Sequence, residues 1–284
     1  MNTRNRITLL LAAIIVVALL VVGMTLTTSA ANEGDLVTEY GVVPAEHANN
    51  NFAIFHKAEG AKEYTFLTSV SDAFSDAAFT NYRNLTGELV ALALKDATCG
   101  SLETPALINA NLVFDLGDKV ITAPSTGNKG LIMARASAVS SDRVMNITVK
   151  NGTISHGKDN VVLLGATAAN SSVLGGNKLH INLTFSEVTF DQIDGTTTDW
   201  VIVQAANTHA DDKALFTNTV LFDECVFDTT GIASGTHILF CGWKSSFHNY
   251  TIEVKGGEIY MDSVHPEIAR NSAVCWDWQC AQVN

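Results

Sequence analysis

The hydrophobic positions of this chain recur in segments that align with one another without gaps. Each segment has apolar residues at its second, fourth and ninth positions, and the segments are 146–154, 182–190, 219–227 and 251–259. The third position is mostly polar, so the first half of each segment alternates and predicts a strand with one buried face. The odd step to the ninth position indicates a bend within the segment, where Gly152 and Gly257 are suitably placed.

A fifth segment, 111–117, extends this series toward the N-terminus. The fourth-position residues are spaced 35, 36, 37 and 32 residues apart, and they are Phe114, Val149, Phe185, Phe222 and Val254. Short apolar runs follow the first segments at 131–134, 161–164, 201–204 and 238–241, and 273–276 is expected to open a fifth. Such runs are too short for helices. The pattern predicts an all-β solenoid, a single-stranded right-handed parallel β-helix of about five coils of 32–37 residues.

The region before the repeats has a different pattern. Apolar residues recur there at helical spacing and predict a short capping helix; they are Leu67, Val70, Phe74, Ala77 and Ala78. Ser69 and Asp72 are expected to cap this helix, which would cover the apolar end of the first coil before a buried strand at 89–94. The C-terminal part has no equivalent helix, so we expect an open last coil that associates end to end.

The first 31 residues carry a targeting pattern. Arg4 and Arg6 precede an almost continuous apolar run at 7–24, and small residues follow at 28–31. That order predicts a cleaved signal peptide, and the alternative is a membrane anchor formed by residues 7–26. Either way the remainder is exported, as a secreted or cell-surface protein. The predicted divisions are 1–31 for the signal or anchor, 32–88 for the N-terminal segment with its capping helix, and 89–284 for the β-helix.

Composition narrows the classes of function. Hydrophobic residues make up 47% of the chain and charged residues 16%, which excludes a disordered protein. The formal charge is −12, and it becomes −14 without residues 1–31, which hold two Arg and no acid. Binding of phosphates needs clustered Lys and Arg, so the composition excludes a nucleic acid as partner.

The five cysteines do not form a recognisable framework. An odd number cannot all pair within one chain, and their pairing stays open. They lack the spacing of a zinc site, so no metal site is predicted. Cys225 and Cys241 lie in apolar runs, and we interpret them as small core residues.

Several stretches near the start of the repeats resemble a known group of proteins. Residues 94–98 (Leu-Lys-Asp-Ala-Thr) precede 114–121 (Phe-Asp-Leu-Gly-Asp-Lys-Val-Ile), and 40–44 and 52–55 lie upstream. In this order they are similar to the opening coils of pectate-lyase-like right-handed β-helix proteins exported by gut Firmicutes. The resemblance spans residues 40–260 and implies the fold. It also suggests a search for residues that cleave polysaccharides.

Asn111, Asn146 and Asn182 recur at the same point of three coils. In pectate-lyase-like folds a stacked asparagine ladder lines a turn, and each side chain bonds the backbone and its neighbour. We interpret these residues as such a structural ladder rather than as a binding site.

The acidic residues do not complete a catalytic pattern. A glycosidase needs carboxylates that flank one bond, and the resemblance implies that they would lie in Asn-Thr-Asp, Asp-Asp and Gly-His-Gly motifs. The nearest match is Asn207-Thr208-His209 followed by Asp211 and Asp212, with His in place of the Asp of the first motif. A lyase needs calcium-binding acids and a basic residue that takes the proton. A second acidic loop has no Arg or Lys at a matching position one coil away; its acids are Asp191, Asp194 and Asp199. We interpret all these acids as solvated turn residues, and we expect no cofactor, since nothing supports calcium.

Aromatic residues beside the second strand series are the remaining candidates for ligand contact. They are Trp200, Trp243, Trp276 and Trp278, with His237 and His248 near Trp243. Exposed aromatic faces stack on sugar rings, and burial in the core is the alternative interpretation.

The leading hypothesis is an exported or cell-surface β-helix module without catalytic activity, which acts in adhesion or in contact with glycans of the cell envelope. Two alternatives stay open. One is an extracellular polysaccharide lyase or glycoside hydrolase, and the other is an N-terminal fragment of a longer β-helix surface protein.

Overall fold

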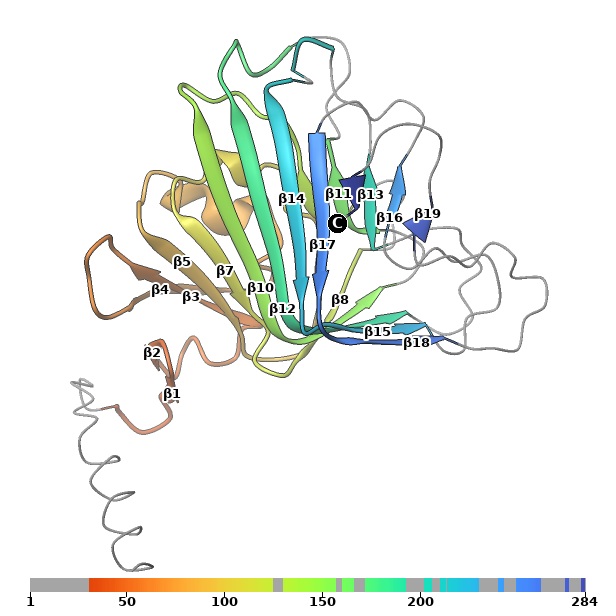
Figure 1. Cartoon of the computed structure of the whole chain (residues 1–284). Coiled ribbons are helices and arrows are strands. Elements are labelled where there is room, and N and C mark those ends of the chain that lie inside the picture. Colours follow the sequence, from red (N-terminus) through yellow and green to blue (C-terminus); the bar gives the residue numbers. More distant parts are fainter. Residues whose placement is uncertain are drawn as a thin grey trace, which may run out of the picture.

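The computed structural model describes residues 31–283, apart from 125–129, 157–159, 166–171, 193–201, 206–209, 213, 230–239, 243–248, 262–273 and 276–281. The described chain is mostly β and is built around a large mixed sheet (Figure 1). It also contains short 3₁₀ helices, η1 (Asp76–Tyr82), η2 (Pro105–Leu107) and η3 (Ala210–Asp212). No helix among the described residues is long and apolar enough to cross a membrane. The predicted signal or anchor, 1–31, falls almost wholly outside the described residues.

The main path of the large sheet places sequence repeats side by side. Its strands follow the order β20 (Gln282–Val283), β17 (Asn249–Lys255), β14 (Phe216–Asp223), β12 (Leu179–Gln192), β10 (Arg143–His156), β7 (Asn111–Asp115), β5 (Glu88–Ala93), β3 (Phe52–Lys57) and β4 (Thr65–Val70). Neighbours from β20 to β5 are parallel. Strand β3 is antiparallel to both β5 and β4, which makes the sheet mixed.

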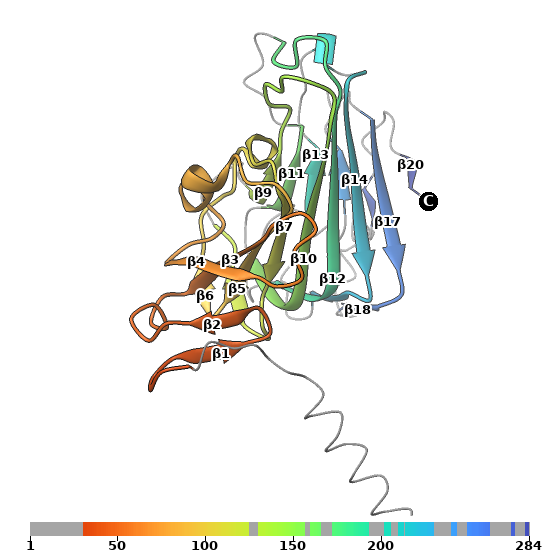
Figure 2. The same ribbon diagram turned by 90° about the vertical axis from the view of Figure 1, so that its left-hand side faces the viewer.

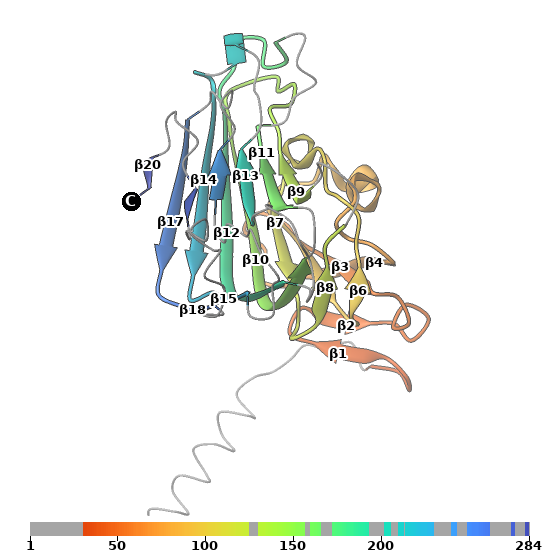
Figure 3. The ribbon, with the colours of Figure 1, turned by 90° about the vertical axis from the view of Figure 1, so that its right-hand side faces the viewer.

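Two further sets of parallel strands follow the main path along the chain. The strands after the bend are β6 (Ala97–Thr98), β8 (Val120–Thr122), β15 (Val226–Thr229) and β18 (Glu258–Met261), which pair with one another or with the second halves of β10 and β12. A separate parallel sheet contains β9 (Gly130–Ala134), β11 (Asn160–Leu164), β13 (Val203–Ala205), β16 (Phe240–Gly242) and β19 (Val274–Cys275) (Figures 1 and 3). The chain therefore returns to equivalent positions in the same order.

The register predicted from the repeats is confirmed in the core. Ile147 pairs with Leu183, Leu183 with Val220, and Val220 with Ile252. Each of these four side chains is at most 3% exposed. The alternation of apolar and polar residues thus places one column of side chains inside the molecule, as expected for half-buried strands.

The bend that the repeats predict is present, and in the first repeat it lies at Asn151, one residue before Gly152. Asn151, Glu187, Glu224 and Gly256 hold equivalent positions, and their φ angles are 59°, 55°, 52° and 66°. Gly152, one residue later, is needed for close packing, because a Cβ there would lie 2.5 Å from the Cβ of Leu116. Non-glycine residues seldom adopt positive φ, so the bend stores a small conformational cost in successive repeats.

The predicted helix over 67–78 is wrong in position and type. Residues 65–70 form β4, which pairs with the edge of β3, and the helix that follows is the 3₁₀ helix η1. Strand pairing satisfies backbone groups along β3, and this outweighs the helical spacing of the apolar residues. Asp72 accepts bonds from the backbone N–H groups of Phe74 and Gly100, each at 2.8 Å, and so caps a turn.

The N-terminal segment covers both sides of the first parallel strands. Phe74 and Phe79 are buried against Phe114, with ring centroids 4.3 and 6.0 Å apart. On the other side, the hairpin β1 (Leu36–Thr38) and β2 (Gly41–Val43) brings Tyr40 and Val43 onto a separate small core over β3 and β5 (Figure 2). Strands and a short 3₁₀ helix therefore do what the capping helix was expected to do.

Candidate functional site

Most of the candidate residues singled out in the sequence lie outside the described residues. The six aromatic candidates, Trp200, Trp243, Trp276, Trp278, His237 and His248, lie outside the described residues, as do Asp194, Asp199 and the segment 207–209. Asp191, at the end of β12, and Asp211, in η3, are exposed.

Asp212 is not the solvated turn residue that its sequence context predicts. Its side chain is fully buried, and its carboxylate accepts the hydroxyl of Ser172 at 2.5 Å. It also accepts the backbone N–H groups of Val173 at 2.8 Å and Leu174 at 3.2 Å. These bonds replace the lost water, so Asp212 holds a loop of the preceding repeat in place.

The two buried cysteines that are described are core residues. Cys99 and Cys225 are free thiols. Cys225 lies next to the backbone oxygen of Phe185, at 3.4 Å, and burial raises the pKa of its thiol to about 11. A thiol with a raised pKa is a poor nucleophile, which fits the interpretation of Cys225 as a small core residue.

The three asparagines are joined side chain to side chain on the outer face of the sheet. Asn146 donates to Asn111 at 3.0 Å, and Asn182 donates to Asn146 at 2.9 Å. They lie on strands β7, β10 and β12 rather than at a turn, because their position in the repeat falls within the alternating half. The Oδ1 of Asn182 bonds the ring of His180 at 2.6 Å, and that ring bonds the hydroxyl of Thr217 at 2.5 Å.

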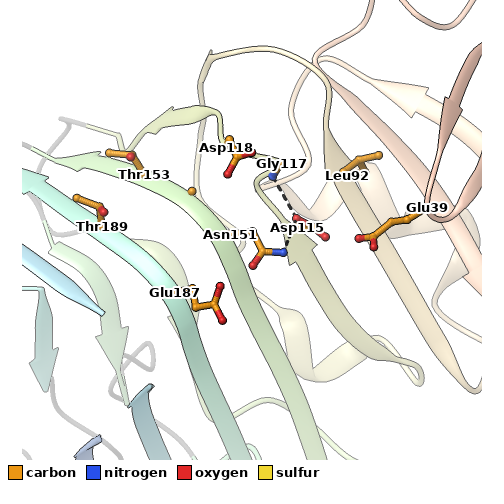
Figure 4. Close-up of a pocket in the computed structure, with 10 residues that line it drawn as sticks. Glu39, Leu92, Asp115, Gly117, Asp118, Asn151, Thr153, Glu187 and Thr189 are labelled. Carbon is orange, nitrogen blue, oxygen red and sulfur yellow. Dashed lines mark hydrogen bonds between the residues drawn. The ribbon is translucent and has the colours of Figure 1, made fainter. Parts of the chain in front are cut away.

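A groove opens where β7, β10 and β12 reach their bends. It has a volume of about 460 Å³, and its lining residues are Glu39, Leu92, Asp115, Gly117, Asp118, Asn151, Gly152, Thr153, Glu187 and Thr189 (Figure 4). The bend places Asn151 and Glu187 at equivalent positions of neighbouring strands, so successive repeats contribute polar groups to one wall. We call this the acidic groove.

Asp115 anchors one end of the acidic groove. Its side chain is 2% exposed and accepts the Tyr40 hydroxyl at 2.5 Å and the Lys150 ammonium at 3.1 Å. The Gly117 N–H and the Asn151 amide reach its other oxygen at 3.1 and 3.3 Å. Burial alone would raise the pKa of Asp115, but the bonds from Tyr40, Lys150 and Gly117 hold that pKa below its usual range.

Lys150 belongs to the same network of contacts as Asp115. Besides Asp115, its ammonium group lies 3.8 Å from Glu39 and 5.6 Å from the centre of the Tyr40 ring. Asp118 and Glu187 add further carboxylates, so the lining of the acidic groove has a net negative charge. Carboxylate, amide and hydroxyl groups here can accept hydrogen bonds from a ligand or attract a cation.

Sequence reasoning missed the acidic groove. Tyr40 and Asp115 are 75 residues apart, and no local motif joins them. The signal that could have found the groove is the polar residue after each alternating half, seen as Asn151 and Glu187. Among the described residues, no group of three His, Cys, Asp or Glu side chains is placed to hold a metal ion.

Comparison with protein-family models, curated proteins and solved structures finds no match to this chain.

Proposed function

We propose that this chain is an exported, non-catalytic surface module, a right-handed parallel β-helix that contacts neutral or amine-bearing glycans through its acidic groove. The fold proposal is supported by parallel pairing of repeats about 35 residues apart and by the shared interior column. Right-handed connections between parallel strands are strongly preferred, which supports the handedness. Export is supported by the charge and hydropathy pattern of residues 1–31.

The acceptor-rich lining of the acidic groove is the observation that carries the glycan proposal. Sugar hydroxyls and protonated amines are donors, and Asp118, Asn151 and Glu187 offer acceptors on neighbouring repeats. The same charge disfavours polyanions such as polygalacturonate. A neutral or amine-bearing sugar is therefore the ligand class that the groove fits best.

Asp115 is unsuited to act as a catalytic acid. Glycoside hydrolysis needs one protonated carboxyl group as acid and a second carboxylate. Asp115 accepts bonds from Tyr40, Lys150, Gly117 and Asn151 and has a lowered pKa, so it stays ionised and serves the fold. We expect purified protein to release no unsaturated oligomers from polygalacturonate, with or without calcium.

Isothermal titration with a chitosan oligosaccharide, its N-acetylated form and a polygalacturonate oligosaccharide tests the proposal. We expect binding of the first two, with the amine form tighter because of its charge. Glu187→Gln and Asp118→Asn should each weaken binding of the amine form about ten- to a hundredfold, since a charged hydrogen bond contributes about 1.5–3 kcal/mol. Glu59→Gln, an exposed acid outside the groove, is the control. Equal affinity of all variants, or cleavage of any oligosaccharide, contradicts the proposal.

A further inference from the structure

A second hollow lies on the same strands as the acidic groove, at their opposite ends. It has a volume of about 440 Å³ and is formed where β10, β12 and β14 begin, with Arg143, Val144, Lys178, His180, Leu215 and Thr217 in its lining. Lys150, at the groove end of β10, is seven residues from Arg143, about 23 Å at 3.3 Å per residue. We call this hollow the basic pocket.

The lining of the basic pocket holds two cations, Arg143 and Lys178, against one carboxylate, Asp142. The Arg143 guanidinium donates to the backbone oxygens of Ala106, at 2.6 Å, and Ile108, and it is only partly exposed. Asp142, the acid in the lining, accepts the backbone N–H of Lys178 at 2.8 Å. Within the part of the chain that the structure describes, no carboxylate forms an ion pair with Arg143 or Lys178.

This local excess stands out because the chain as a whole carries a formal charge of −12. Arg keeps its proton in proteins, so the guanidinium remains a cation beside the exposed Lys178 ammonium. An anionic group of a ligand could form charge-assisted hydrogen bonds with these cations.

The rest of the basic pocket has an apolar side chain, Val144, beside a hydroxyl group whose direction is fixed, that of Thr217. Val144 is 61% exposed, which is the largest exposure among the large hydrophobic side chains of the described residues. Beside it, the His180 ring bonds the Thr217 hydroxyl at 2.5 Å and fixes its direction. A sugar ring has both an apolar C–H face and hydroxyl groups, and such a ring suits this combination.

We propose that the basic pocket binds one anionic sugar residue, a uronate or a sugar sulfate, with its anion at Lys178 and its ring over Val144. This inference extends the proposed glycan contact and names a second site for it. The chain as a whole carries a formal charge of −12, so the further anions of a continuous polyanion would be repelled outside this pocket. The ligand should therefore carry anions separated by neutral residues.

Titration with two oligosaccharides tests this site: one alternates glucuronate and N-acetylglucosamine, and the other alternates sulfated and neutral galactose. We expect at least one to bind more tightly than polygalacturonate of equal length. Lys178→Gln should weaken that binding about tenfold and reduce its dependence on salt, and the exposed Lys62→Gln should change neither. The oligosaccharide that binds identifies the anion as carboxylate or sulfate.

Equal binding by the protein and by Lys178→Gln overturns the proposal, as does binding of neither oligosaccharide at millimolar concentration. Lys178 is exposed, so its replacement should leave the melting temperature unchanged, and this is checked first. The proposals for the two sites can be tested independently of each other. Glu187→Gln should keep the uronate or sulfate binding, whereas Lys178→Gln should keep binding of the chitosan oligosaccharide.

Discussion

Phe222 and Val254 occupy the same position on neighbouring strands, yet their environments differ. Phe222 is fully buried and stacks on Phe185 of the strand before it, with ring centroids 5.3 Å apart. Val254, one strand further on, is 41% exposed. Phe227 and Ile259 differ in the same way, at 1% and 46%. Burial of an apolar side chain here depends on the repeat that follows it, more than on the residue itself.

Substitution by Asp at Phe222 and at Val254 should give the largest difference in folding between the two regions. Phe185→Asp or Phe222→Asp should abolish soluble expression, since an unpaired buried charge costs several kcal/mol. Val254→Asp should express, because its partly exposed side chain keeps the new carboxylate in contact with water. Soluble yield and circular dichroism measure the outcome. Loss of folding in Val254→Asp would show that the last strands are as well packed as the first.

The buried carboxylate of Asp115 should give the next largest effect. Asp115→Asn removes an acceptor of the Tyr40 and Lys150 bonds and should cost about 1–3 kcal/mol in the free energy of unfolding at pH 7. Because the folded-state pKa is lowered, this contribution is complete above the unfolded pKa of about 3.9 and is lost as the pH falls through the folded value. Urea unfolding at several pH values should therefore show a smaller difference between the two proteins in acid. A constant difference from pH 7 to pH 2.5 would contradict this.

Asn218 tests how strictly the core tolerates polar groups, in the buried column two residues before that of Val220. It lies between Ile181 and Tyr250 in register and is 2% exposed, and neither its amide nitrogen nor its oxygen has a hydrogen-bond partner among the residues that the structure describes. Asn218→Leu should raise the free energy of unfolding by about 1–2 kcal/mol by removing this desolvation cost. Asn182→Leu, on the outer face, is the matched control and should not stabilise. A destabilised Asn218→Leu would indicate that the amide has a role that this geometry lacks.

The sequence predicts the repeats well because their spacing and alternation are local properties. The pairs from Ile147 to Ile252 follow directly from aligning the segments. The structure of residues 67–78 could not be predicted from their local spacing, since the pairing of β4 with β3 makes residues 65–70 a strand. The acidic groove was missed because Asp115 gains its character from Tyr40, Lys150 and burial, which only the fold brings together.

Hydrogen exchange in the dilute protein tests most directly the claim that each repeat is buried by the next, on which both proposed sites depend. Amides of β12, which has a parallel partner on each side, should exchange much more slowly than those of β18, which pairs with β15 alone among the described strands. Measurement at several protein concentrations separates this from association of the last coil, which would slow β18 as concentration rises. Protection of β18 equal to that of β12 at the lowest concentration would contradict the account.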